Sequence, residues 1–256
     1  MTSAGLQKPV VSGRFLLFLH VKNMATILCI ESATPICSVA LVQKGVVIRL
    51  QETDVLQSHA ASLMEFIQDA LVSAGLAVSA IDAVAVSKGP GSYTGLRIGV
   101  STAKGLCFAL DKPLIGIGTL KSMAIGMIRA CQSSEISTLF CPMLDARRME
   151  VYTALYNSTA AEIVPVSAKI IDESSFAEEL KSHTIVFAGN GAAKCRKLLG
   201  YHPHVRFLNQ EIVSAANMAS LAKDAFSKGL FEDVAYFEPY YLKDFIAGKS
   251  IVKGLR

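Results

Sequence analysis

Four glycines mark the stretch of this chain that is best suited to bind a phosphate group. Gly89, Gly91, Gly95 and Gly99 follow the apolar run of residues 83–86 and precede a segment with helical apolar periodicity. The pattern predicts a strand, a tight turn and a helix, and the free N–H groups at the start of a helix can bind an anion. The glycine spacing matches neither the dinucleotide fingerprint nor the P-loop. Two interpretations therefore stay open, a phosphate cradle and a close-packed connection between strand and helix.

Acidic residues and a second glycine turn extend the first interpretation. Glu31 and Asp145 each follow an apolar run that predicts a strand, and carboxylates at such positions can hold the Mg²⁺ of a nucleotide. The turn after Glu31 argues against this, because it lacks glycine and contains Pro35, which has no N–H to donate. The candidate nucleotide-binding residues are Glu31, Gly89, Gly91, Gly189 and Gly191.

The elements that position these residues occur twice. Residues 26–110 and 137–199 each predict three strands, a helix, a strand, a glycine turn and a second helix. Two such units in 256 residues predict an α/β fold of the duplicated ribonuclease-H-like (actin-like, ASKHA) type, with a mixed β-sheet flanked by helices in each lobe. In that architecture a nucleotide would lie in the cleft between the lobes.

The repeat divides the chain into three parts. We expect the first lobe at residues 24–122 and the second at residues 123–256, with the C-terminal aromatic segment 237–243 docking back on the core. Residues 1–23 precede Met24, which stands just before the first convincing strand. We expect them to form a disordered N-terminal extension that arises from a misassigned start, because their apolar run is too short for a signal peptide.

Two predicted helices, residues 57–74 and 93–110, carry more apolar residues than one sheet contact needs. In the first helix the apolar positions span an arc of about 160°, wider than a single core-facing stripe. Either the helix is flanked on two sides within the chain, or part of the arc contacts another chain. The candidate interface residues on the two helices are His59, Leu63, Met64, Ile67, Leu71, Tyr93, Arg97, Val100 and Lys104.

The composition excludes several classes of protein. Hydrophobic residues make up 52% of the chain, which indicates a globular protein, and no apolar run approaches the roughly 18 residues of a membrane span. The net charge of +4 permits contact with nucleic acid without demanding it, because the basic residues are scattered. The six cysteines lack the spacing and histidine partners of a zinc site, and they indicate reduced thiols in a cytoplasmic protein.

Several segments together resemble the family of proteins that make N6-threonylcarbamoyladenosine on tRNA. The resemblance lies in residues 27–32, 83–99, 103–105 and 113–116, and it is greatest to the non-catalytic dimerisation subunit of that family. It implies a two-lobed actin-like fold and a catalytic sister subunit, TsaD, which holds a metal through a His-x-x-x-His pair. It also implies a small P-loop ATPase, TsaE, and a separate enzyme that makes threonylcarbamoyl-adenylate.

The resemblance and the residues together give two functional hypotheses. Thr119 and Met123 stand where the metal-binding histidines would be, and both are poor ligands for a hard catalytic metal. The first hypothesis is therefore a scaffold subunit without catalytic residues or a metal, in which ATP or ADP binding is at most vestigial. It would bind TsaD, support threonylcarbamoyl transfer to N6 of adenosine 37, contact tRNA indirectly, and form a homodimer when alone. The alternative is a stand-alone actin-like ATPase or kinase that uses the inter-lobe cleft.

Overall fold

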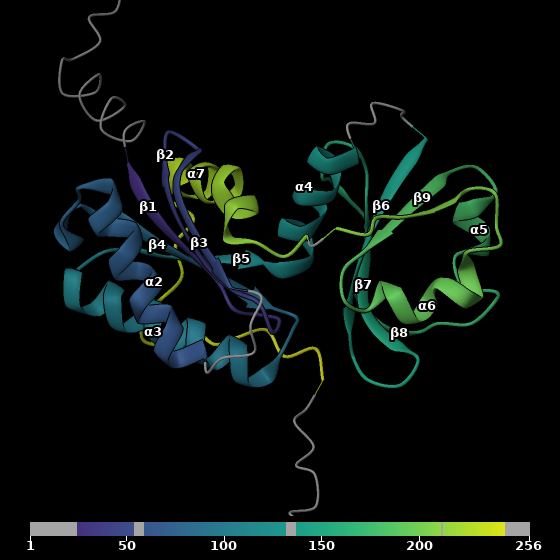
Figure 1. Ribbon diagram of the computed structural model, residues 1–256, viewed down its shortest axis with the longest axis horizontal. Helices are drawn as coiled ribbons and strands as arrows, with labels where there is room; N and C mark the ends of the chain where they lie inside the picture. The colour runs from purple at the N-terminus through teal and green to yellow at the C-terminus, as the bar shows by residue number, and fades with distance from the viewer. Residues whose placement is uncertain (1–24, 54–58, 132–136, 211, 244–256) are drawn as a thin grey trace, which may run out of the picture.

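The computed structural model describes residues 25–53, 59–131, 137–210 and 212–243, which form two lobes side by side (Figure 1). The predicted N-terminal extension, residues 1–23, lies outside the described residues. Each lobe is built on a five-stranded sheet with helices on both faces. The predicted two-lobed α/β architecture is therefore confirmed.

The first sheet has the strand order β3-β2-β1-β4-β5. Its strands are β1 (Thr26–Glu31), β2 (Cys37–Gln43), β3 (Val46–Thr53), β4 (Ala83–Gly89) and β5 (Leu114–Gly118). The first three strands form the predicted antiparallel meander, whereas β4 runs parallel to β1 and β5 runs parallel to β4. Both faces of β1 are buried, which explains why its sequence is apolar without alternation.

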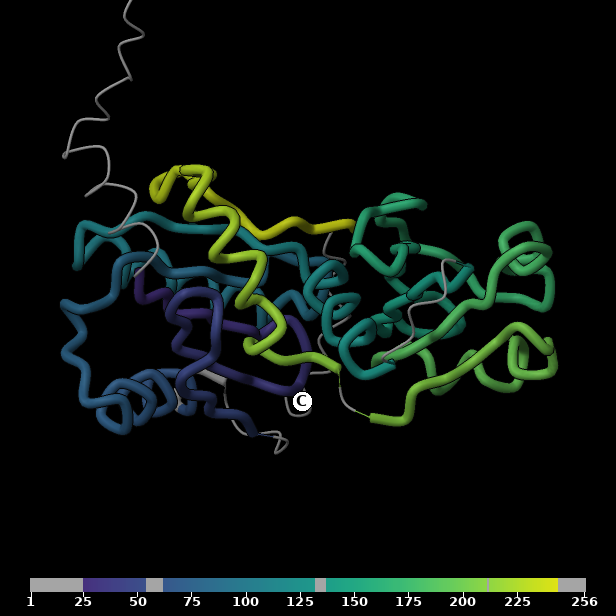
Figure 2. Tube along the Cα trace, turned by 90° about the horizontal axis from the view of Figure 1, so that it is seen from above, coloured from purple at the N-terminus to yellow at the C-terminus, as the bar shows by residue number. Residues whose placement is uncertain are grey.

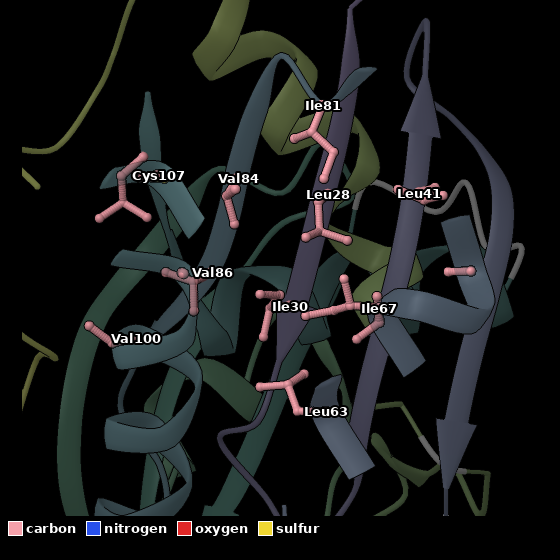
Figure 3. Close-up of a cluster of buried hydrophobic side chains, with 14 of the residues drawn as sticks. Leu28, Ile30, Leu41, Leu63, Ile67, Ile81, Val84, Val86, Val100 and Cys107 are labelled. Carbon is pink, nitrogen blue, oxygen red and sulfur yellow. The ribbon is translucent and has the colours of Figure 1, made fainter. Parts of the chain in front are cut away.

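Helices cover both faces of the first sheet. On one face lie α2 (His59–Ala74) and α3 (Tyr93–Leu110), and a 3-10 turn, η1 (Val78–Ala80), follows α2. Their apolar side chains meet those of the sheet in one cluster, which Figure 3 shows around Leu28 and Ile30. On the opposite face lie the 3-10 turn η2 (Ala215–Met218) and α7 (Ala219–Lys228).

The second sheet repeats this connectivity, with the order β10-β9-β6-β7-β8. Its strands are β6 (Thr138–Asp145), β7 (Glu150–Tyr156), β8 (Glu162–Ile170), β9 (Thr184–Ala188) and β10 (Val205–Phe207). The strands β6, β7, β8, β9 and β10 correspond in turn to β1, β2, β3, β4 and β5, with the same parallel and antiparallel pairs. This correspondence confirms the predicted duplication, and it adds β10, which the sequence pattern had not indicated.

The helices of the second lobe also join the two lobes. On one face of the second sheet lie α5 (Ala177–Leu180) and α6 (Ala192–Leu199), and on the other lies α4 (Thr119–Cys131). Although α4 directly follows the last strand of the first sheet, its apolar side packs on the second, while α7 follows β10 and packs on the first. The predicted boundary between residues 122 and 123 falls inside α4, which is one continuous helix.

No helix among the described residues combines the length and the apolar character that crossing a bilayer requires.

Candidate functional site

The first glycine turn joins β4 to α3 and begins the helix with a capping residue. Gly89 has a φ of 109°, a conformation that side-chain-bearing residues rarely adopt. Ser92 is the N-cap of α3, and its hydroxyl accepts a hydrogen bond of 3.3 Å from the Gly95 N–H. The Ser92 N–H donates at 2.7 Å to the carbonyl of Ala33, in the turn between β1 and β2. Two amides that could have faced a phosphate are therefore bonded within the protein.

Three glycines allow α3 to touch the β1–β2 turn directly. A Cβ atom at Gly91 would collide with Ala33, and one at Gly95 or Gly99 would collide with Ser32. The hydroxyl of Ser32 also donates to the Gly95 carbonyl at 2.9 Å. The β1–β2 turn therefore packs directly against the glycine turn and the start of α3, which supports the close-packing interpretation of Gly91.

The carboxyl group of Glu31 does not face an open site. Glu31 is the last residue of β1, its side chain is 1% exposed, and it accepts a hydrogen bond of 2.7 Å from the Ala33 N–H. Burial raises the pKa of this carboxyl, against the smaller opposing effect of its hydrogen bonds. A Mg²⁺ ligand needs an ionised and accessible carboxylate, which is the opposite of this environment.

The second glycine turn repeats this packing in the second lobe. A Cβ at Gly189 would meet the Met143 carbonyl, and the Gly191 N–H donates to that carbonyl at 3.0 Å. Asp145, the counterpart of Glu31, is exposed and forms an ion pair with Lys194. Partial burial raises the pKa of Asp145, but its bonds to Lys194 and to the Arg147 N–H outweigh this and hold the pKa below its ordinary value.

A pocket of about 480 Å³ lies between the lobes, but it collects few of the candidate residues. Gly89 lines it, whereas Glu31, Gly91, Gly189 and Gly191 do not. Its charged lining residues come from several elements and have mixed signs: Lys88, Lys121, Glu162, Asp224 and Lys228. The structure therefore does not gather the five candidates into one nucleotide site.

The buried cysteines offer no activated nucleophile. All six thiols are free, and five of them are buried. Burial raises the pKa of Cys29 to about 12, and burial with a smaller effect of Glu31 raises the pKa of Cys37 to about 11. Thiols with such values stay protonated and unreactive near neutral pH.

The structure corrects part of the predicted interface on α2 and α3. Four of its residues belong to the core of the first lobe and cannot reach another chain: Leu63, Ile67, Leu71 and Val100. Figure 3 shows Leu63, Ile67 and Val100 within the cluster of buried side chains. The prediction was wrong for these residues because most of the apolar arc of α2 is used by the sheet beneath it.

Other large side chains on the same two helices do face solvent. Met64 is 51% exposed and Val72 is 71% exposed on α2, and Phe108 is 85% exposed on α3. Arg97 is also exposed on α3. We call these four residues the helical face. His59 begins α2, but its side chain lies outside the described residues.

The remaining two candidates hold the C-terminal segment, residues 230–243, against the first lobe. The ammonium group of Lys104 donates to the carbonyls of Ala235 at 3.1 Å and Phe237 at 2.9 Å. The ring of Tyr93 contacts that of Tyr241, with 5.0 Å between the centroids. Phe237 packs into the first-lobe core, and Figure 2 shows this segment crossing the first lobe toward the second. Sequence reasoning did not predict these roles for Lys104 and Tyr93.

Comparisons with known proteins identify the family of this fold. The family model for TsaD, tRNA N6-adenosine threonylcarbamoyltransferase, matches residues 52–253. The tRNA threonylcarbamoyladenosine biosynthesis protein TsaB of Escherichia coli (strain K12) is 31% identical over 237 residues, which cover 88% of this chain and 97% of the relative. The chain belongs to the family of TsaB proteins.

Two further relatives agree with this assignment. The TsaB protein of Bacillus subtilis (strain 168) is 29% identical over 68% of this chain and 75% of its own length. A solved structure of YeaZ from Pseudomonas aeruginosa superposes with a TM-score of 0.71 and 28% identity, over 86% of this chain and 100% of that one. The predicted family is therefore confirmed, and the relatives' names place them in the biosynthesis of threonylcarbamoyladenosine.

The metal that the resemblance implies for the catalytic sister subunit does not fit this chain. Thr119 and Met123 both lie in the first turns of α4, and both side chains are buried. The Met123 methyl group packs against Gly189, so this side chain serves the contact between α4 and the second glycine turn. A hydroxyl and a thioether are poor ligands for a hard catalytic metal. The described residues also contain no cluster of three or more histidine, cysteine or acidic side chains that could hold an ion.

Proposed function

We propose that this chain is a non-catalytic subunit in the synthesis of threonylcarbamoyladenosine on tRNA, where it binds a catalytic sister subunit of the TsaD type. The helical face is the observation that carries the proposal. Three large apolar side chains on two neighbouring helices remain exposed, although the sheet already buries the inner sides of both helices. Large apolar side chains that stay exposed on neighbouring helices are candidates for a protein–protein contact.

The residues at the metal and nucleotide positions of the fold support a scaffold role over a catalytic one. Thr119 and Met123 cannot replace a pair of histidine ligands, and Glu31 is buried rather than facing a nucleotide. The turns that would cradle phosphates are packed against their own neighbouring hairpins. A lobe pair with these features can still present a rigid surface, because the close packing fixes α3 on the sheet.

The exposure of Phe108 allows an estimate of how much the helical face contributes to the binding free energy. Its ring is 85% exposed, and burying a phenylalanine side chain stabilises a complex by about 1.5–3 kcal/mol. A carboxylate at this position would lose that contribution and add a desolvation cost. We therefore expect Phe108→Asp to weaken binding of the sister subunit at least about tenfold, since each 1.4 kcal/mol corresponds to a factor of ten.

The test is a calorimetric titration of the full-length chain with the catalytic sister subunit. Wild type and Phe108→Asp are compared with Ile170→Asp, which changes another exposed apolar residue, on β8 of the second lobe, where Ile170 is 70% exposed. The proposal requires weaker binding for Phe108→Asp and unchanged binding for Ile170→Asp. Equal binding by all three proteins would contradict it, and circular dichroism confirms that each variant is folded.

The same face would support self-association when the sister subunit is absent. A two-fold axis through the helical face would pair each exposed apolar group with an equivalent surface, as in most homodimers. Light scattering of the isolated chain should show a dimer, and Phe108→Asp should shift it to a monomer. A small P-loop ATPase of the TsaE type and an enzyme that supplies threonylcarbamoyl-adenylate would complete the pathway that the family resemblance implies.

One observation favours a second candidate function, a stand-alone ATPase or kinase. The inter-lobe pocket of about 480 Å³ is large enough for a small ligand and has Lys88, Lys121 and Lys228 among its lining residues. Titration of the isolated chain with ATP and Mg²⁺ separates the two functions. The scaffold proposal predicts no turnover, whereas micromolar binding together with ATP hydrolysis would favour the enzyme.

A further inference from the structure

Equivalent turns in the two lobes have very different side chains. The β1–β2 turn of the first lobe, residues 32–36, has no charged residue and is largely buried against α3. Its counterpart between β6 and β7 contains Arg147 and Arg148, and both arginines are exposed. The duplicated fold has therefore placed two adjacent cations on the outer surface at only one of its two equivalent positions.

The backbone of the β6–β7 turn is held in a costly conformation. Arg147 has a φ of 71° and Arg148 a φ of 50°, which is the left-handed region that residues with side chains seldom adopt. This conformation is disfavoured because it brings the Cβ atom too close to the following carbonyl oxygen. Hydrogen bonds fix the turn, from the Arg147 N–H to Asp145 Oδ1 at 2.9 Å and from the Ala146 N–H to the Glu150 carbonyl at 3.1 Å. The two guanidinium groups thus extend from a constrained base.

The neighbouring carboxylates are already paired with lysines. Lys194 forms an ion pair with Asp145, and Lys243 forms one with Glu150. Arg147 acts on Asp145 only as a smaller electrostatic neighbour. In the described part of the chain no ion pair involves Arg147 or Arg148. The four cations and two carboxylates of this cluster therefore carry a net charge of +2, and both uncompensated charges belong to the arginines.

The sequence that follows continues this positive charge. Lys243, the last described residue, lies against Glu150 at the start of β7. The residues after it include Lys249, Lys253 and Arg256, with Asp244 as the one acidic residue. The sequence beyond Lys243 thus carries three cations and one acidic residue.

We propose that Arg147 and Arg148 bind phosphate groups of an RNA backbone, so that this chain contacts tRNA directly through the β6–β7 turn. Guanidinium groups are suited to phosphate because their N–H donors match two of its oxygens at once. An exposed turn suits a polyanion that passes over the surface, and neither arginine lines the pocket between the lobes. The inference rests on the proposed function, in which tRNA is the substrate of the complex.

The experiment measures binding of a labelled, unmodified tRNA transcript to the full-length chain by fluorescence anisotropy, from 50 to 200 mM salt. The test variant is Arg147→Ala/Arg148→Ala. The control, Arg129→Ala/Arg206→Ala, removes the same charge from two other exposed arginines, on α4 and β10. A third variant, Arg147→Lys/Arg148→Lys, keeps the charge. Inorganic phosphate and ATP serve as competitors, which distinguishes a polyanion site from a site for a free phosphate group.

The expected result is a change in salt dependence. Loss of two phosphate contacts makes the negative slope of log K, the binding constant, against log salt concentration shallower by about 1.8. Between 50 and 200 mM salt, the affinity of the test variant therefore falls about tenfold less than that of wild type. The control keeps the wild-type slope, and the lysine variant keeps most of it. An unchanged slope in the test variant, an equal change in the control, or displacement by millimolar phosphate would overturn the inference. Binding of the sister subunit, measured separately, tells this failure apart from failure of the proposed function.

Discussion

Replacing Gly95 with alanine tests whether close packing seats the helix that carries the helical face. Gly95 lies on α3 where an added Cβ would collide with the backbone carbonyl of Ser32. Ser32 belongs to the β1–β2 turn, and the carbonyl of the next residue, Ala33, accepts a hydrogen bond from the Ser92 N–H. The turn therefore cannot move away from α3 without breaking this hydrogen bond. Overpacking of this kind costs about 1–3 kcal/mol.

A second glycine of the same helix provides a matched control. Gly105 has no atom within 4 Å of the position that a Cβ would take, and it is exposed. Alanine there should stabilise the chain by about 0.8–1 kcal/mol, because glycine is a poor helix former. Since Gly95→Ala gains the same propensity, we expect it to be less stable than Gly105→Ala by about 1–3 kcal/mol.

Urea unfolding followed by circular dichroism measures both variants against wild type. We expect the midpoint of Gly95→Ala to lie below that of Gly105→Ala with an unchanged slope, which would show that stability rather than compactness has changed. A Gly95→Ala protein as stable as Gly105→Ala would refute the close-packing account. It would leave the glycines of this turn without a structural role and would restore the phosphate-cradle interpretation.

Three further predictions follow from individual side chains. Burial raises the pKa of Glu31 above its ordinary value of 4.5, so ionisation of this carboxyl destabilises the folded state increasingly as pH rises from about 4.5 toward the raised pKa. Glu31→Gln should therefore gain stability relative to wild type between pH 4 and pH 8. A stability difference that does not change with pH would contradict this. Lys104→Met removes the charge-assisted hydrogen bonds to the carbonyls of Ala235 and Phe237, which are worth about 1.5–3 kcal/mol. It should speed hydrogen exchange and proteolysis in residues 230–243, and unchanged rates would show that Lys104 does not hold this segment. Leu63→Asp should unfold the chain, because it buries a charge in the core, and a folded Leu63→Asp protein that only loses partner binding would place Leu63 on the interface after all.

The architecture was predictable because it depends on patterns that repeat along the chain. The strands and glycine turns stand out as short apolar runs followed by Gly89 or Gly189, and the pattern occurs twice. The helix α4 was missed, although Leu120, Met123 and Met127 have helical spacing and all three are buried. Its direct start after β5, without a loop, leaves no turn signal to mark it.

The site was less predictable because one-dimensional patterns do not show which neighbour covers a residue. The apolar arc of α2 contains both Leu63, which faces the sheet, and Met64, which faces solvent. Glu31 has the residue type of a metal ligand, but whether its carboxyl is open or buried depends on the distant segment that packs over it. The roles of Lys104 and of the arginine pair depend on contacts with residues far away in sequence, or on backbone angles, and neither is visible in composition or spacing.

Hydroxyl-radical footprinting of the full-length chain, with and without the catalytic sister subunit, tests the docking proposal most directly. Met64 and Phe108 are reactive and exposed on the helical face, and Tyr201, which is 69% exposed in the second lobe, serves as an internal reference. We expect the sister subunit to lower the oxidation of Met64 and Phe108 several-fold and to leave that of Tyr201 unchanged. Unchanged oxidation of Met64 and Phe108 in a complex that does form would contradict it.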